Sequence, residues 1–120
     1  MNGVMRWQEI TQMKRGEVWW VEFDPSVGSE IQKTRPAVII SNDAANRHLA
    51  RVVVIPITSN TGRIYPSESI ITLCGKQGKA MADQIMAADR KRLKKYIDTL
   101  SVADMAGIER VVKIHLGLFG

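Results

Sequence analysis

The stretch QKTRPAVIIS, residues 32–41, places an arginine and a proline directly before a run of strand-forming residues. Residues 37–40 are apolar and mostly β-branched, which predicts a buried strand that ends at the turn-forming residues 41–43. Pro36 lacks an N–H and restricts the preceding residue to an extended backbone. We therefore expect Arg35 at the mouth of this strand, on a stiffened backbone, where its guanidinium can reach solvent.

Other stretches on both sides of this one also have the composition of strands. They are rich in β-branched and aromatic residues and are bounded by turn residues, at residues 16–23, 51–58, 67–73 and about 79–86. Pro56 lies inside one of them and favours an edge strand or a bulge, because proline cannot donate to a central ladder. The segment 74–78, with Gly75 and Gly78, predicts a hairpin turn rather than a phosphate-binding loop.

The last part of the chain has a different period. Ser101 with Asp104 three residues on resembles a capping box, with Asp in place of the usual Glu or Gln. Apolar residues then follow at helical spacing, at Met105, Ile108, Val112 and Leu116. The sequence thus predicts a mainly β fold, a small barrel of short antiparallel strands covered by one C-terminal amphipathic helix.

Composition limits the class of protein. A chain of 120 residues forms one domain, and 45% hydrophobic with 24% charged residues is ordinary for a soluble globular protein. No apolar run approaches the roughly 20 residues of a membrane span. Residues 1–12 lack the features of a secretory signal and are expected to form a leader outside the domain, which spans 13–120. The single Cys74 fits a reducing cytoplasm.

The net charge makes polyanions attractive partners. Seventeen Lys and Arg residues against twelve Asp and Glu give +5, and the isoelectric point is near 9.7. Many small soluble proteins are equally basic and bind no nucleic acid, so the charge alone leaves both interpretations open.

The usual catalytic constellations are absent from the sequence. His48 and His115 are far apart, and with one cysteine and no HExxH or CxxC spacing we expect no metal site and no cofactor. Asp83 and Asp89 are candidates for paired carboxylates, although charges on a solvated strand are commoner.

Arg35 and Thr58 remain as the candidates that carry chemistry. An arginine presents a fixed fork of donors that matches a phosphate, and a threonine hydroxyl can donate to a phosphoryl oxygen. Together they can stabilise charge on a phosphate without a metal. An arginine and a threonine at strand ends are more often structural, so the residue types alone do not decide. Other polar residues expected near strand ends are Ser29, Glu30, Asn42, Ser59 and Gln84.

Four segments, in this order, resemble the MazF/PemK family of toxin–antitoxin ribonucleases. They are MKRGEVWWVEFDPSVGSE (13–30), KTRPAVIISND (33–43), IPIT (55–58) and AMADQI (80–85). The resemblance implies an SH3-like barrel that works as a homodimer and cleaves single-stranded RNA without a metal. It also implies that Arg35 and Thr58 are catalytic and that Ser29, Glu30 and Gln84 contact RNA. Lys33, in a loop more basic than in many relatives, is expected to join them.

The resemblance also implies the mechanism and the partners. The 2′-hydroxyl attacks the adjacent phosphorus, leaving a cyclic phosphate and a 5′-hydroxyl. An antitoxin with an acidic, partly disordered segment is expected to block the basic RNA site. Two alternatives stay open, namely a gyrase-binding toxin of the CcdB type without nuclease activity and an inactive RNA-binding relative.

Overall fold

Strands β1 (Glu17–Glu22) and β2 (Thr34–Ile39) form the antiparallel ladder that carries Arg35. They belong to a computed structural model that describes residues 13–23 and 34–118. The remaining elements are β3 (Arg51–Thr58), β4 (Glu68–Leu73), β5 (Lys76–Met81), β6 (Met86–Asp89) and β7 (Leu93–Thr99), the helices α2 (Asp43–His48) and α3 (Val102–Leu116), and the 3₁₀ turns η1 (Ala82–Gln84) and η2 (Arg90–Arg92).

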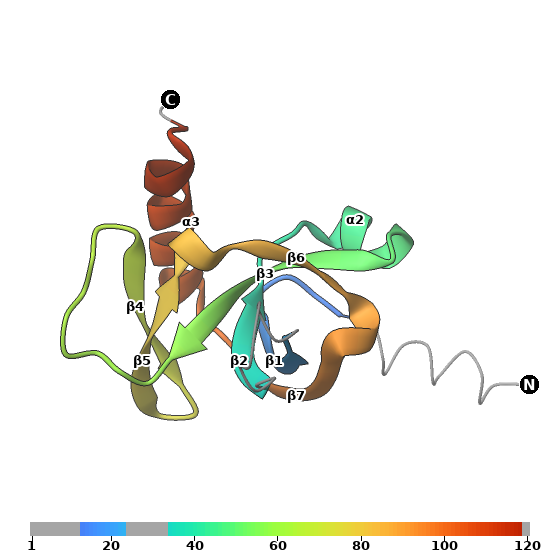
Figure 1. Cartoon of the computed structure of the whole chain (residues 1–120), viewed down its shortest axis with the longest axis horizontal. Helices are drawn as coiled ribbons and strands as arrows, with labels where there is room; N and C mark the ends of the chain where they lie inside the picture. The colour runs from blue at the N-terminus through green and yellow to red at the C-terminus, as the bar shows by residue number, and fades with distance from the viewer. Residues whose placement is uncertain (1–12, 24–33, 119–120) are drawn as a thin grey trace, which may run out of the picture.

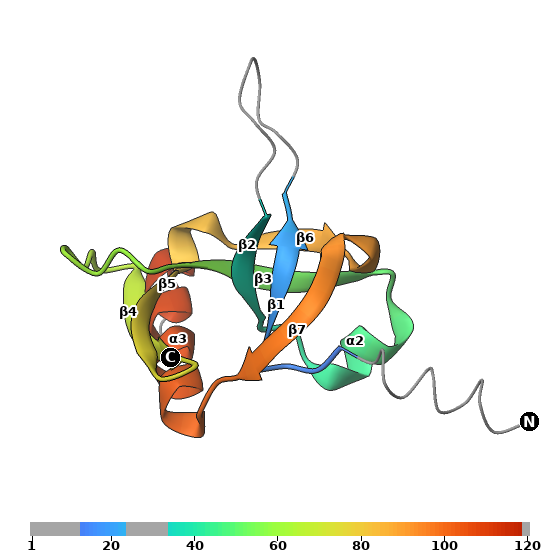
Figure 2. The same cartoon turned by 90° about the horizontal axis from the view of Figure 1, so that it is seen from below.

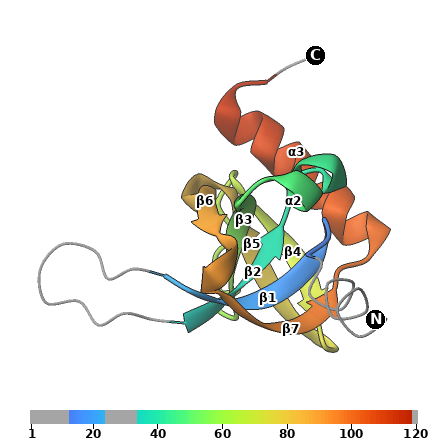
Figure 3. The same ribbon diagram turned by 90° about the vertical axis from the view of Figure 1, so that its right-hand side faces the viewer.

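All the strand pairs of the described sheet are antiparallel, in the order β4-β5-β3-β2-β1-β7, and β6 also pairs with β3. The sheet curls on itself, and α3 stands beside β4 and β5 (Figures 1 and 2). Seen along the long axis of the molecule, β1, β2 and β3 form the wall of a half-barrel (Figure 3). The expected small antiparallel barrel with a C-terminal helix is confirmed.

Two apolar cores lie on the two faces of this sheet. Alternate residues of β3 serve both, since Val52 and Val54 lie in one core and Ile55 and Ile57 in the other. The first core is enclosed by the curled sheet and includes Met13, Val21 and Ile39, and the second is covered by α3. Burial on both faces explains why the sequence of β3 is a nearly continuous apolar run.

Pro56 is expected to mark an edge strand or a bulge. The edge strand is wrong, because β3 is central, and its register with β2 runs without a shift from Val54 to Pro56. It pairs with β2 along one side, and along the other with β6 through Val54 and with β5 from Ile57. The N–H of Ile40 donates to the carbonyl of Val53, so these two residues form a hydrogen-bonded pair of the β2–β3 ladder. Hydrogen-bonded and non-hydrogen-bonded pairs alternate, which makes Ala37–Pro56 a non-hydrogen-bonded pair. The Pro56 nitrogen therefore points away from β2. That nitrogen faces the place where β3 changes partner, where no ladder bond is lost.

The hairpin between β4 and β5 is tighter than expected. Its turn consists of Cys74 and Gly75, both with positive φ (51° and 80°), between the paired Leu73 and Lys76. Two positive φ angles match the turn that best fits the twist of a hairpin. Residues 76–78 therefore belong to β5, which ends at Met81, and the strand expected over 79–86 is split by η1.

Helix α3 begins where the sequence predicts. The Ser101 hydroxyl accepts from the Asp104 N–H (3.0 Å), but the Asp104 carboxylate accepts from the Thr72 N–H of β4 (2.9 Å) and ties the helix to the sheet. Met105 and Ile108 are buried as expected. Val111 is also buried, Val112 packs partly buried against the same core, and Leu116 is about half exposed (49%), so the expected stripe is wrong at Leu116.

Candidate functional site

Arg35 is the second residue of β2, at the strand mouth where the sequence places it. It pairs with Val21 of β1, and Pro36 pairs with Trp20. The side chain of Arg35 is half-buried, and the ladder on one side and the proline on the other fix its backbone. The guanidinium is thus presented from a rigid strand and not from a loop.

Thr58 is the last residue of β3, close to the mouth of β2. The β2–β3 register ends at the pair Ala37–Pro56, two residues from Arg35 along β2 and two from Thr58 along β3. The Thr58 Oγ1 accepts from the N–H of Asn60 (3.2 Å). Because a hydroxyl has one proton and two lone pairs, its O–H remains available to an incoming acceptor.

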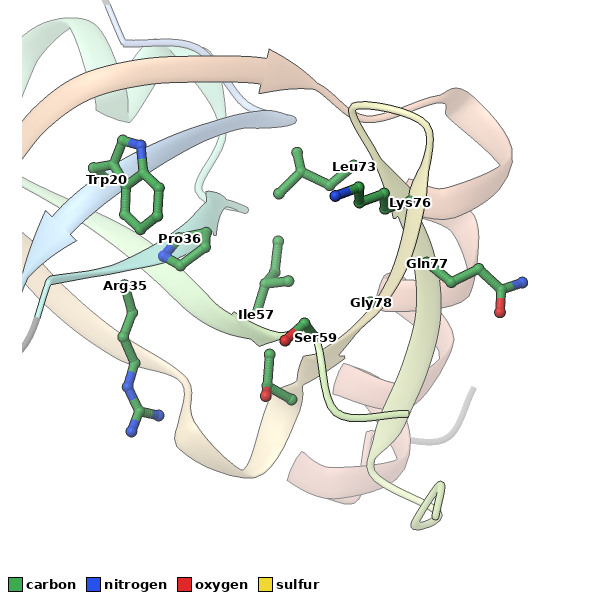
Figure 4. Close-up of a pocket in the computed structure, with 10 residues that line it drawn as sticks. Trp20, Arg35, Pro36, Ile57, Ser59, Leu73, Lys76, Gln77 and Gly78 are labelled. Atoms are coloured by element: carbon green, nitrogen blue, oxygen red, sulfur yellow. The ribbon is translucent and has the colours of Figure 1, made fainter. Parts of the chain in front are cut away.

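Both residues border a pocket of about 430 Å³. Arg35 lies at one side of the pocket, and Lys76 and Gln77 lie at the other (Figure 4). Between them the walls are apolar, formed by Trp20, Pro36, Ile57 and Leu73. An aromatic and aliphatic lining with cations at the rim is chemistry that suits a nucleobase beside a phosphate.

The strand pairing extends this site across the sheet. Thr58 pairs with Lys79 of β5, and directly opposite side chains share one face of a sheet. Met81 lies two residues further on the same face, and the Gln84 Nε2 is 3.5 Å from the Met81 Sδ. Gln84 is therefore on the side of Thr58, although it does not line the pocket.

Lys79 carries the buried charge beside the site. Its Nζ lies 2.8 Å from the Glu68 Oε1 and donates to the Arg63 carbonyl (2.6 Å). Burial opposes ionisation of Glu68, but the hydrogen bonds from Lys79 and from the Tyr65 N–H outweigh it and lower the pKa of the Glu68 carboxyl.

Several other residues singled out in the sequence are not among those that the structure places at the pocket. Ser29, Glu30 and Lys33 lie outside the described residues, so their RNA contacts stay predictions, as does the leader 1–12. The histidines at 48 and 115 are exposed. Asp83 lies in η1, whereas Asp89 caps η2 by accepting from the Lys91 N–H (2.9 Å), so the two carboxylates belong to separate elements.

Trp20, Lys76 and Gln77 were not expected at the site. Trp20 carried a signal, because a large aromatic next to a second tryptophan in one strand must face the opposite side from its neighbour. Lys76 and Gln77 gave no such signal in the sequence, since they resembled turn residues.

Within residues 13–23 and 34–118, no three His, Cys, Asp or Glu side chains gather as metal ligands would. Over the same residues, no helix combines the length and apolarity that crossing a membrane requires.

Residues 14–116 match the family of PemK-like, MazF-like toxins of type II toxin–antitoxin systems, and the chain belongs to this family. The chain is 40% identical over 116 residues to the endoribonuclease MazF9 of Mycobacterium tuberculosis, which covers 89% of this chain and 98% of that protein. It is 32% identical over 111 residues to the endoribonuclease MazF of Staphylococcus epidermidis (88% and 92% covered).

A solved structure shares the fold. It is an endoribonuclease in complex with its cognate antitoxin from a mycobacterial species, with a TM-score of 0.74 and 29% identity over 89% of this chain and 97% of that chain. The resemblance to MazF/PemK toxins is confirmed, and the gyrase-binding alternative is not favoured by these relatives.

Proposed function

We propose that the protein is a toxin that cleaves single-stranded RNA within short sequence motifs, as an endoribonuclease without a metal. The observation that carries the proposal is that Arg35 and Thr58, near the ends of the adjacent strands β2 and β3, border one pocket. The relatives named as endoribonucleases support the reaction class.

The proposed reaction is an internal transfer at phosphorus. The 2′-hydroxyl loses its proton and attacks the adjacent phosphorus, the bond to the 5′-oxygen breaks, and that oxygen takes up a proton. Arg35 neutralises the charge that develops on the phosphorane-like transition state, because its backbone is fixed in β2 and its guanidinium presents a planar fork of donors. Thr58 donates its free O–H to a non-bridging oxygen. The products are a 2′,3′-cyclic phosphate and a 5′-hydroxyl.

The proposed partners follow from charge and family. The site works in a homodimer in the cytoplasm, and an antitoxin with an acidic, partly disordered segment covers it. The solved relative in complex with its cognate antitoxin supports the partner. Ser29, Glu30, Lys33 and Gln84 are proposed RNA contacts. Of these, Gln84 has support from its place beside Met81.

The test is to incubate purified protein with mixed single-stranded RNA, with and without excess EDTA, and to sequence the new 5′ ends. We expect cuts within a short motif, 5′-hydroxyl ends and equal cleavage in EDTA. A requirement for Mg²⁺ would overturn the Arg35–Thr58 mechanism, and binding without cuts would restore the inactive alternative.

A further inference from the structure

Lys79 is a charged residue almost wholly withdrawn from water. It is 7% exposed, on the central part of β5. Three groups surround its ammonium: the Glu68 Oε1 (2.8 Å), the Arg63 carbonyl (2.6 Å) and the face of the Tyr65 ring (5.5 Å to the centroid). A buried ammonium is tolerated only with such partners, and removal of them leaves a costly unpaired charge.

These partners come from the connection between β3 and β4. Residues 59–67 leave β3 at Thr58, and Glu68 follows as the first residue of β4. The oxygen of Glu68 that contacts Lys79 also accepts from the Tyr65 N–H (2.8 Å). Arg63 lies over the same Tyr65 ring (5.7 Å). Lys79 therefore holds the second half of the connection down on β5.

The first half of the same connection holds the Thr58 hydroxyl. The Asn60 N–H donates to the Thr58 Oγ1 (3.2 Å), and the Gly62 N–H donates to the Asn60 Oδ1 (3.2 Å). These hydrogen bonds run from Thr58 to Gly62, and the next residue along the chain is Arg63, whose carbonyl Lys79 holds. Lys79 is also the direct cross-strand partner of Thr58, so the connection is pinned beside the residue that it orients.

We infer that Lys79 is a positioning residue for Thr58, acting by anchoring the β3–β4 connection and not by touching RNA. The inference rests on the proposed function. Two of the three N–H donors of Lys79 are engaged, by Glu68 and the Arg63 carbonyl, and its side chain is only 9% exposed, which disfavours direct phosphate binding as its main role. Its effect on cleavage is transmitted through the direction of the Thr58 O–H.

The chain offers a matched control in Arg15. Its guanidinium also links one carboxylate and one backbone carbonyl, those of Glu109 (2.6 Å) and Ile40 (3.1 Å). Arg15 precedes Gly16, whose N–H donates to the Ile39 carbonyl at the end of the β1–β2 ladder far from Arg35. Arg15→Met therefore removes an anchor with the same kinds of partner, although a more exposed one (33% against 9% for the side chain), and leaves the connection after Thr58 untouched.

The experiment compares Lys79→Met, Lys79→Arg and Arg15→Met. Single-turnover cleavage is measured on an RNA whose cut site has been mapped, and affinity is measured on the same RNA with a 2′-deoxy nucleotide at the cut. Since Lys79→Met leaves the Glu68 charge unpaired, the double variant Lys79→Met/Glu68→Gln, which removes both charges, is measured beside it. Thermal melting and backbone ¹⁵N order parameters of Asn60 and Gly62 complete the set.

We expect Lys79→Met and the double variant to lose at least about tenfold in cleavage rate, because misplacing a group by about 1 Å costs up to about 100-fold. Their affinity stays unchanged, and the order parameters of Asn60 and Gly62 fall. Lys79→Arg recovers much of the rate, since a guanidinium can reach both oxygens. Arg15→Met loses stability without loss of rate well below its melting temperature.

Two results would overturn the inference. One is wild-type cleavage and wild-type order parameters in the double variant. The other is a loss of rate that follows the loss of stability equally in Lys79→Met and Arg15→Met, which would make Lys79 merely structural. If the wild-type protein cleaves no RNA, the proposed function has failed, and the order parameters of Asn60 alone decide whether Lys79 fixes the connection.

Discussion

Arg35 is the residue on which the proposed chemistry depends most. Because β2 and Pro36 fix its backbone and the guanidinium is a rigid fork of donors, we expect Arg35→Ala to lose about 10²–10³ in single-turnover rate, as removal of one preorganised donor does. RNA affinity should fall much less, since other cations such as the exposed Arg63 also attract the backbone. Arg35→Lys should rescue little, because an ammonium keeps the charge and loses the planar fork.

The control for the two Arg35 variants is their thermal stability. The side chain stands at the strand mouth, and Arg35 is not a member of either apolar core. Both variants should therefore melt within a few degrees of the wild type. Wild-type cleavage by Arg35→Lys would show that a plain positive charge suffices, and simple melting of Arg35→Ala would show that the arginine is structural.

The sequence contains the signals for Arg35 and Thr58 but not for Lys79. Arg35 and Thr58 stand at the ends of strands whose apolar runs are continuous. Their position at the strand ends therefore follows from the local pattern of the sequence. Lys79 looks like any strand lysine. Its burial depends on Glu68, which only the β4–β5 register brings near, and on a connection that folds back over β5. Such long-range contacts have no local period.

At the scale of elements, the strands with two or more buried residues were predictable, and those with a single buried residue were not. The apolar runs of β1, β2, β3 and β4 mark their positions. In β6 only Ala88 is buried, and in β7 only Leu93. These two strands form because β3 and β1 offer them ladder partners, so their hydrophobic signal is weak.

Glu68, at the end of the connection between β3 and β4, makes the free energy of unfolding depend on pH. The Glu68 carboxyl has a lowered pKa in the folded state: burial opposes this, and the bonds from Lys79 and Tyr65 prevail. The folded state thus binds the proton less readily than the unfolded chain. The contribution of Glu68 to the free energy of unfolding is present above the unfolded pKa and is lost as pH falls through the folded pKa.

We therefore expect Glu68→Gln to flatten the acid limb of the stability profile. Urea denaturation from about pH 6 to about pH 3 should show the wild type losing its advantage over Glu68→Gln as the pH falls. Asp43, whose pKa is lowered chiefly by the Arg15 N–H, titrates in both proteins and cancels in the difference. Parallel profiles over this range would show that the Lys79–Glu68 pair does not contribute.

At the scale of the whole molecule, α3 and the residues directly after it leave apolar side chains exposed in the described chain. Ile114, Leu116 and Leu118 are 46%, 49% and 57% exposed. Symmetric pairing would bury such side chains, so we expect sedimentation at micromolar concentration to give a dimer. A clean monomer would count against an RNA site shared between two copies.

The net charge of +5 makes a prediction about how RNA is held. If phosphates are neutralised by Lys and Arg, counterions are released, and log K should fall linearly with log [salt]. The expected slope is about −0.7 for each phosphate that a single strand presents to the protein. Uncleavable RNA with a 2′-deoxy nucleotide at the cut keeps catalysis out of the measurement.

The slope measured for single variants shows which side chains contact phosphates. Arg35→Ala and Arg63→Ala should each reduce its magnitude by about 0.7 if each cation contacts one phosphate. Lys79→Met should leave the slope unchanged, because the buried Nζ is held by Glu68 and the Arg63 carbonyl and releases no counterion when RNA binds. A flat salt response in the wild type would mean that the basic charge is incidental to binding. A smaller slope in Lys79→Met would mean that the ammonium reaches the RNA.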